Sequence, residues 1–191
     1  MSNFILHKPF GYTSQFVRNQ PTRRNKKLLG ELYDFPEGTM AIGRLDEASE
    51  GLLLLTTDGK LSQKVRGKNV EKEYYVELDG QIDAAAVARL REGVTISIRG
   101  GKYPAKAVAV KAIDPPALPE RHVPVRKHRP TSWISIVLNE GKNRQVRKMC
   151  AAVGFPVLRL VRVRIGGLEL GDFVPAKVVE VKDDFEMVFG G

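Results

Sequence analysis

The sequence is poor in the residues that hold metals or form crosslinks: it has a single cysteine, Cys150, and three histidines. One cysteine excludes an internal disulfide and is typical of a reducing compartment, so we expect a cytoplasmic protein. His7, His122 and His128 lack the paired spacing of a metal site. The sequence also lacks a phosphate-binding loop and a dinucleotide glycine fingerprint after a strand. We therefore predict no metal and no organic cofactor.

Long apolar runs are missing as well. The longest, LLLL at 52–55, has the length of a buried strand and falls far short of the ~20 residues that a membrane span needs. The first ten residues, MSNFILHKPF, lack the apolar centre of a signal peptide. We expect no membrane partner.

Acidic residues are also in the minority among the charged side chains. The chain carries 22 acidic against 31 basic residues and a net charge of +9, which favours a polyanionic partner. On charge alone, a basic soluble protein without a nucleic-acid partner is an equal alternative. No groove-reading helix motif is present, so DNA is not expected as the partner.

Hydrophobic periodicity predicts many strands and few helices in irregular order, which is typical of an α+β fold. Helical spacing occurs at 28–35, at 84–92 between a capping Asp83 and Gly93, and at 144–153. The stretch at 18–27 is strongly basic, and the proline-rich segment 115–130 is expected to be a basic loop. Strands are expected at 4–7, 52–57 (ended by a turn at Asp58-Gly59), 73–78, 94–98, 105–113, 132–138, 158–166 and near 177–181.

Few residues of the chain remain as candidates for a catalytic role. Cys150 falls on the apolar face of the helix at 144–153, where a small packed side chain is expected in place of a nucleophile. Asp46 lies in a polar loop just before the strand at 52–57, a common place for catalytic groups. An isolated loop aspartate is, however, more often a turn residue. The residues alone predict a cytoplasmic, basic, RNA-binding domain and no further.

Four sequence motifs, which follow one another along the chain, extend this prediction. HKPFG at 7–11, GRLDEASEGLLLLTTDG at 43–59, KEYYV at 72–76 and LNEGKNRQVRKMCAAVGFPVLRLVRVRIG at 138–166 resemble the Rsu-type branch of the ribosomal-RNA pseudouridine synthases. The resemblance implies an α+β fold with a mixed, mainly antiparallel central sheet, flanked by helices and loops, and a cleft between two lobes. It implies a single catalytic domain over 1–191, with a lobe boundary near 75–80 and a C-terminal strand that returns to the sheet.

One departure from the family indicates a subgroup. HKPFG begins at residue 7, so the small N-terminal RNA-binding (S4) domain of the family is expected to be absent. This feature, PVRKHRPTSW at 124–133 and the pair Gln15-Phe16 resemble the stand-alone type-E enzymes. The implied function is isomerisation of a uridine in 23S rRNA near the peptidyl-transferase centre by a monomer. The alternative is a non-catalytic rRNA-binding or ribosome-assembly factor with the same fold.

The resemblance also assigns catalytic residues. Asp46 matches the family's catalytic aspartate, and its attack on the base, its attack on the sugar and its removal of a sugar proton all remain open. Arg147 would keep this carboxylate ionised through an ion pair; the alternative is a solvated helix charge. Tyr74 would stack on the uracil, and its neighbour Tyr75 points to the opposite strand face; the alternative for Tyr74 is a core aromatic.

The remaining candidates bind substrate. Leu160 would lie under the base, which is compatible with an ordinary core position. Arg44 would either enter the stack vacated by the extruded uridine or contact phosphate, and we hold these equal. Lys8 is expected to bind RNA, and Lys142 and Arg144 to contact phosphates together with the basic segments 18–27 and 121–129.

Overall fold

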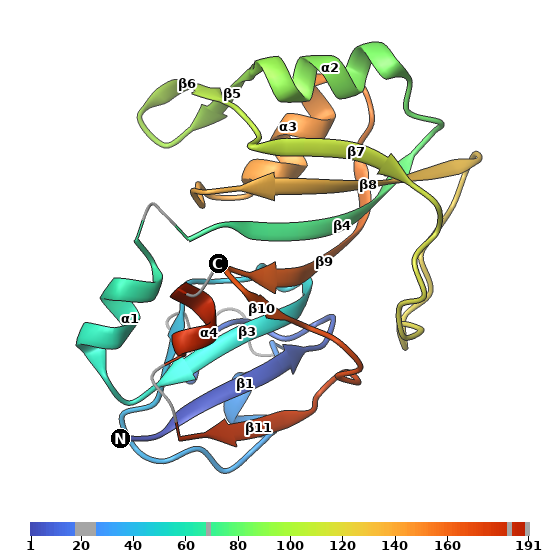
Figure 1. Ribbon diagram of the computed structural model, residues 1–191. Helices are drawn as coiled ribbons and strands as arrows, with labels where there is room; N and C mark the ends of the chain where they lie inside the picture. Colours follow the sequence, from blue (N-terminus) through green and yellow to red (C-terminus); the bar gives the residue numbers. More distant parts are fainter. Residues whose placement is uncertain (18–25, 68–69, 183–184, 190–191) are drawn as a thin grey trace. The chain divides into compact units, whose positions relative to one another are not determined.

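The computed structural model describes residues 1–17, 26–67, 70–182 and 185–189 (Figure 1). The chain forms two compact units. The first unit contains Met1–Val70 and Arg162–Gly191, and the second contains Glu71–Val161. The C-terminal segment thus joins the N-terminal one in the first unit. Most of the basic stretch predicted at 18–27 lies outside the described residues.

The first unit is built on a sheet of strand order β11-β1-β3-β9, in which β2 also pairs with β3 and β10 with β9. The pairs of β1 with β3 and β11, of β2 with β3 and of β10 with β9 are antiparallel. In the part of this unit that the structure describes, three short helical segments accompany the sheet. The strands are β1 (Asn3–Lys8), β2 (Met40–Ile42), β3 (Glu50–Thr56), the end of β9 (Val157–Ile165), β10 (Leu168–Glu169) and β11 (Val178–Val181); the helical segments are η1 (Leu29–Glu31), α1 (Gly59–Val65) and α4 (Glu186–Phe189).

Two adjacent strands form the core of this unit. Every residue of β1 and of β3 is buried. Phe4 pairs with Leu55 on one face of the sheet and Ile5 pairs with Leu54 on the other, so apolar side chains line both faces. Burying one such side chain contributes ~1.5–3 kcal/mol. The run of leucines therefore forms a central strand, as its length predicts.

Two local predictions for this unit were wrong. The helix expected at 28–35 is a single 3-10 turn, Leu29–Glu31. Beyond it, the rings of Tyr33 and Phe35 pack on Phe4 with centroids 5.8 and 5.2 Å apart, and this aromatic packing replaces helical hydrogen bonding. The turn expected at Asp58-Gly59 instead begins α1, because the Asp58 carboxylate accepts a hydrogen bond from Lys60 N–H at 2.8 Å and caps the helix.

The second unit has the strand order β9-β4-β8-β7 and a separate hairpin of β5 and β6. β8 lies between β4 and β7 and is antiparallel to both. The antiparallel α+β prediction is thereby confirmed. The elements are β4 (Lys72–Asp79), α2 (Ala84–Glu92), β5 (Val94–Ile98), β6 (Gly101–Ala105), β7 (Ala109–Ile113), β8 (Thr131–Leu138), α3 (Gln145–Ala152) and the start of β9.

Helix boundaries in this unit follow the sequence signals. The Asp83 carboxylate accepts from Ala86 N–H at 2.7 Å at the start of α2, and Gly93, with φ of +120°, ends it. Of the strand predicted at 105–113, only Ala109–Ile113 forms a strand of its own, β7, which pairs with β8, while Ala105 is the last residue of β6, which pairs with β5. The proline-rich segment 115–130 forms neither helix nor strand, as predicted.

Candidate active site

Asp46 lies in the connection between β2 and β3, residues 43–49, which we call the Asp46 loop. Arg44 is exposed, Leu45 is buried and Asp46 is half-buried, so the loop alternates between solvent and core. The carbonyl of Asp46 accepts a hydrogen bond from Ser49 N–H at 2.9 Å, which closes a turn after the aspartate. Asp46 is therefore a carboxylate held in an ordered turn with part of its surface accessible.

A buried ammonium lies among the charges of this loop. Lys8, at the end of β1, has no exposed surface, and its Nζ donates to the carbonyls of Pro9 at 2.9 Å and Tyr12 at 2.6 Å. Burial lowers the pKa of Lys8 from 10.5 to about 7, although the negative charges of Glu50, Asp46 and Glu47 raise it. The ammonium is thus turned toward the chain's own carbonyls and acidic residues.

Arg162, on β9, supplies a second buried cation in the first unit. Its residue surface is 5% exposed, and its Nε donates to the carbonyl of Leu52 on β3 at 2.7 Å. Within the described part of the chain, no hydrogen-bond partner lies at its Nη2. The positive charge of Arg162 lowers the pKa of Lys8 further. The charges that act on the buried Lys8 are therefore three acidic residues and a second buried cation, Arg162.

Tyr74 and Leu160 occupy buried positions in the second unit. Tyr74 lies on β4 with 9% of its surface exposed, and Leu160 lies on β9 with 6%. Tyr75, which points to the other face of β4, is half-buried. Tyr74 is thus the more enclosed of the two tyrosines, and both of its predicted roles, stacking partner and core aromatic, agree with this environment.

The predicted cations of the second unit surround the start of α3. Lys142 and Arg144 are exposed, and Arg147 is half-buried on the first turns of the helix. Arg144 precedes the helix in the left-handed conformation, with φ of +53°. Burial raises the pKa of Cys150 to about 12, and the positive charge of Arg147 opposes that increase. Cys150 is therefore a protonated, packed thiol, as predicted.

A hydrogen-bonded cluster fixes the segment that precedes α3. The Tyr103 hydroxyl on β6 donates to the Glu140 carboxylate, which raises the pKa of the tyrosine. Gln145 donates to the same carboxylate at 2.7 Å and accepts from Lys142 N–H at 2.9 Å. The Nζ of Lys142 lies 5.0 Å from the centre of the Tyr103 ring. The exposed Lys142 ammonium thus extends from a segment whose backbone is held in place.

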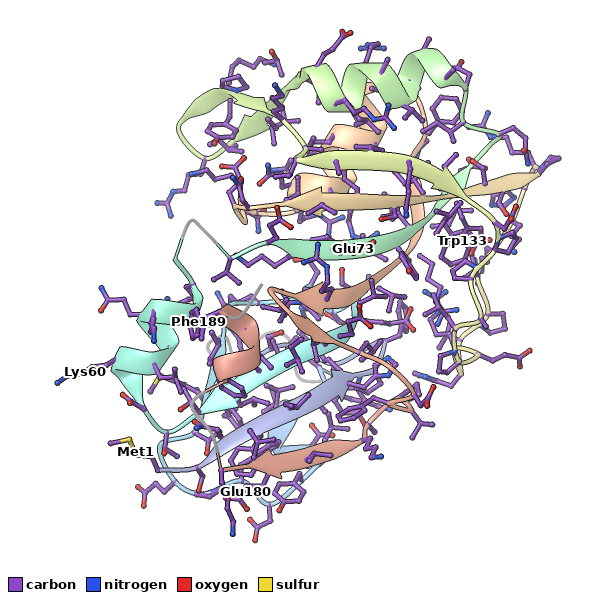
Figure 2. The ribbon with its side chains drawn as sticks, viewed as in Figure 1. Met1, Lys60, Glu73, Trp133, Glu180 and Phe189 are labelled. Atoms are coloured by element: carbon purple, nitrogen blue, oxygen red, sulfur yellow. The ribbon has the colours of Figure 1, made fainter. Side chains whose placement is uncertain are left out.

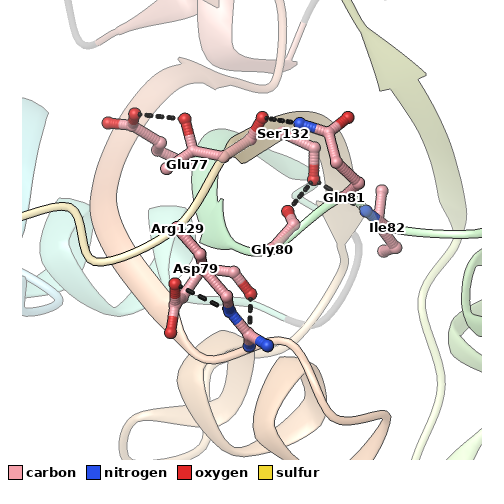
Figure 3. Close-up of polar contacts among 8 residues, drawn as sticks. Glu77, Asp79, Gly80, Gln81, Ile82, Arg129 and Ser132 are labelled. Atoms are coloured by element: carbon pink, nitrogen blue, oxygen red, sulfur yellow. Dashed lines mark hydrogen bonds and ion pairs between the residues drawn. The ribbon is translucent and has the colours of Figure 1, made fainter.

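Two acidic residues of β4 anchor the end of the proline-rich segment, and Figure 3 shows the contact of one of them, Asp79, with Arg129. Arg129 donates from Nε to the Asp79 carboxylate and from Nη2 to the Asp79 carbonyl, both at 3.0 Å. Lys127 forms an ion pair with Glu77 at 2.7 Å. Glu77 pairs across the strands with Trp133, labelled in Figure 2 near the start of β8. Two of the cations predicted to contact phosphate are therefore engaged within the chain.

The structure brings Lys8 and Asp46 together within the first unit. Tyr74, Lys142, Arg144, Arg147 and Leu160 all belong to the second unit. The ion pair between Asp46 and Arg147 joins residues of different units and stays a prediction. Sequence reasoning did not single out Arg162 or Glu140; the signal that could have found Arg162 is the alternation of arginine and valine along β9.

Among residues 1–17, 26–67, 70–182 and 185–189, no cluster of three or more His, Cys, Asp or Glu side chains could hold a metal ion. No helix in those same ranges has the length and apolar character needed to cross a membrane.

Comparison with known proteins identifies a family. Residues 3–152 match the family model described as RNA pseudouridylate synthase. A relative from Xanthomonas axonopodis pv. citri, named ribosomal large subunit pseudouridine synthase E, is 41% identical over 177 residues, which cover 90% of this chain and 89% of the relative. A relative of the same name from Vibrio parahaemolyticus is 40% identical and covers 93% of this chain and 73% of its own.

Two solved structures have a fold similar to that of this chain. A crystal structure described as pseudouridylate synthase superposes with a TM-score of 0.74 at 26% identity, covering 97% of this chain and 72% of that one. A chain of a Cbf5-Nop10-Gar1 complex, at 15% identity and a TM-score of 0.56 over 88% of this chain and 50% of that one, shares the fold.

Proposed function

The chain belongs to the RNA pseudouridylate synthase family, and we propose that it converts a uridine of large-subunit ribosomal RNA into pseudouridine. The observation that carries the substrate is the 40–41% identity, over at least nine-tenths of this chain, to two enzymes named for the large ribosomal subunit. The finer proposal is a uridine of 23S rRNA near the peptidyl-transferase centre. Residues 1–191 would act as one catalytic domain, as a monomer and in the cytoplasm.

The reaction breaks the bond between uracil N1 and the sugar, turns the base and joins C5 to the same sugar carbon. The proton on C5 leaves, and N1 gains one, so the product is an isomer of the substrate. Asp46 is the proposed nucleophile or base. Attack on the sugar, attack on the base and removal of a sugar proton all require the ionised carboxylate. The half-buried position of Asp46 and its ordered turn support this role.

Arg147 is the proposed partner of the Asp46 carboxylate. A carboxylate enclosed with its substrate loses water, and a guanidinium at roughly 4 Å stabilises its charge by about 4 kcal/mol at an effective dielectric constant near 20. Tyr74 is proposed to stack on the detached uracil and Leu160 to lie under it; stacking contributes ~1–3 kcal/mol per base. The aromatic ring of Tyr74 and the apolar side chain of Leu160 both suit contact with the flat face of a base.

The exposed cations are proposed to bind the RNA backbone. Lys142 and Arg144 extend from the segment fixed by Glu140, and Arg44 is exposed two residues before Asp46. Arg44 is placed either to enter the stack left by the extruded uridine or to contact a phosphate. For Lys8 we propose a structural role in place of the RNA contact predicted from the sequence, because its ammonium is buried on Pro9 and Tyr12 carbonyls.

The decisive experiment measures isomerisation directly. A transcript of large-subunit rRNA labelled with tritium at uridine C5 releases its tritium when C5 bonds to the sugar. We expect release with the wild-type protein, none with Asp46→Asn, and wild-type release with the control Asp34→Asn, which alters an exposed carboxylate. Release by Asp46→Asn would refute the assigned residue.

A non-catalytic rRNA-binding or assembly factor is the second candidate. The presence of Asp46, Tyr74 and Arg147 together favours the enzyme. RNA binding without any tritium release by the wild type, together with full complementation of a deletion strain by Asp46→Asn, would support the assembly factor instead.

A further inference from the structure

A short segment after β1 packs against the Asp46 loop through its backbone and one side chain. The Gly11 N–H donates to the carbonyl of Glu47 at 2.8 Å. Three residues later, Ser14 is 8% exposed and its hydroxyl lies against Leu45, the residue before Asp46. The two contacts reach the Asp46 loop on both sides of the aspartate.

Ser14 bonds both polar groups of the Leu45 backbone. Its hydroxyl donates to the Leu45 carbonyl at 2.8 Å and accepts from the Leu45 N–H at 2.9 Å. Both bonds are buried, and Leu45 itself is 5% exposed. A buried backbone group needs a hydrogen-bond partner, and here one hydroxyl supplies partners for two. The peptide groups on both sides of Leu45 are thereby held, and one of them is the peptide bond to Asp46.

The segment that carries Ser14 is itself fixed. Lys8 donates to the Tyr12 carbonyl, and Thr13 donates from its N–H and its hydroxyl to the Lys27 carbonyl at 3.0 and 3.1 Å. On the other side, Lys26 forms an ion pair of 2.6 Å with Glu47 of the Asp46 loop. Ser14 thus connects one anchored segment to the backbone beside the catalytic carboxylate.

We propose that Ser14 is a positioning residue for the isomerisation, acting through Leu45 to hold the Asp46 carboxylate in its reactive place. This inference rests on the function proposed above. Ser14 does not touch the reacting atoms. Catalysis by a positioned group is sensitive to small displacements, and a shift of ~1 Å lowers rates by about a hundredfold. Loss of the hydroxyl leaves the buried Leu45 N–H and carbonyl without this partner, and the loop must move to satisfy them.

Four variants test the proposal. Ser14→Ala removes the hydroxyl, Ser14→Thr keeps it, and Ser14→Cys replaces it with a group of similar size that hydrogen-bonds weakly. Thr39→Val is the matched control, because it removes a hydroxyl outside the Ser14 segment while the Thr39 N–H still bonds the Pro36 carbonyl. Each variant is assayed for single-turnover tritium release at saturating enzyme, for RNA affinity and for thermal unfolding.

For Ser14→Ala we expect the single-turnover rate to fall at least about tenfold, with RNA affinity within about twofold of the wild type. Ser14→Thr should recover most of the rate, Ser14→Cys should be intermediate, and Thr39→Val should match the wild type. A purely structural role would lower thermal stability and leave the rate of the folded protein unchanged. If Ser14→Ala does not fold, the same comparison of single-turnover rate, RNA affinity and thermal stability is made between Ser14→Cys and the wild type.

Wild-type single-turnover rates in both Ser14→Ala and Ser14→Cys would overturn the proposal. So would a loss of RNA affinity equal to the loss of rate. These results differ from failure of the proposed function, in which the wild-type protein itself releases no tritium. With an active wild type and an inactive Asp46→Asn, the Ser14 variants report only on positioning.

Discussion

Gly51 at the start of β3 lies directly against the backbone of Arg162 on β9: a Cβ added to Gly51 would stand 2.3 Å from the Arg162 carbonyl oxygen and 2.7 Å from its nitrogen. Gly51 also has φ of +104°, a conformation that side chains rarely adopt. The absence of a side chain at Gly51 therefore allows β3 and β9 to approach each other closely. This approach lies five residues after Asp46, at the buried Arg162.

Substitution of Gly51 by alanine should destabilise the first unit strongly. We expect Gly51→Ala to lower the free energy of unfolding by about 3 kcal/mol or more, because the added methyl meets backbone atoms and the φ angle is strained. Gly59→Ala is the control, since Gly59 lies at the start of α1 with nothing within 4 Å of its added Cβ. It should be neutral or slightly stabilising. Equal urea midpoints for the two variants would contradict the close approach.

The buried Lys8 should make stability depend on pH. Its pKa is about 7 in the folded protein and 10.5 in the unfolded chain, so the unfolded chain holds more protons between these values. The unfolding free energy should therefore rise with pH from 7 upward, by about 2 kcal/mol between pH 7 and 9. Above pH 9 the buried Cys150 acts in the opposite sense, because its pKa is raised from 9.0 to about 12.

The measurement is urea unfolding at pH 7, 8 and 9. Lys8→Met should lack the rise, while Lys60→Met, which alters an exposed lysine, should retain it. Parallel pH curves for Lys8→Met and the wild type would show that another group is responsible.

Arg147 should be needed for turnover and not for RNA binding. We expect Arg147→Met to lower the single-turnover rate by about a hundredfold or more, since the Asp46 carboxylate would lose the cation proposed to stabilise its charge, while affinity for the rRNA transcript changes little. Lys148→Met removes the adjacent cation of α3 and should leave the rate near that of the wild type. If affinity falls together with rate, Arg147 is a phosphate contact.

Lys142 should contribute to affinity through phosphate. For Lys142→Met we expect weaker RNA binding at low salt and a plot of log affinity against log salt that is shallower by about 0.7 to 0.9. The single-turnover rate at saturating enzyme should stay unchanged. Lys111→Met, an exposed cation on β7, serves as the control. An unchanged salt slope for Lys142→Met would exclude the contact.

The elements found from sequence are those whose signals are local. β1, β3 and α2 have their apolar runs or caps within a few residues, and each lies where the pattern placed it. The segment at 28–35 has helical spacing, but its aromatic rings pack on Phe4, and no local pattern reports that partner. The shortest strands, β2 and β10, are defined by the strand beside them.

The same distinction applies to the candidate site. Asp46 was found through motif resemblance, because a loop aspartate alone is usually a turn residue. The hydrogen bonds of Ser14 join residues 31 apart, and that of Arg162 joins residues 110 apart. Contacts over such separations depend on the fold, so neither residue could be assigned a partner from its neighbours in the sequence.

The anchors of the proline-rich segment also change how its charge should be counted. Lys127 and Arg129 are already neutralised by Glu77 and Asp79, so the segment offers a nucleic acid fewer unoccupied cations than its composition indicates. The proline-rich segment should therefore contribute less affinity for a phosphate backbone, and a smaller part of its salt dependence, than its number of basic residues suggests.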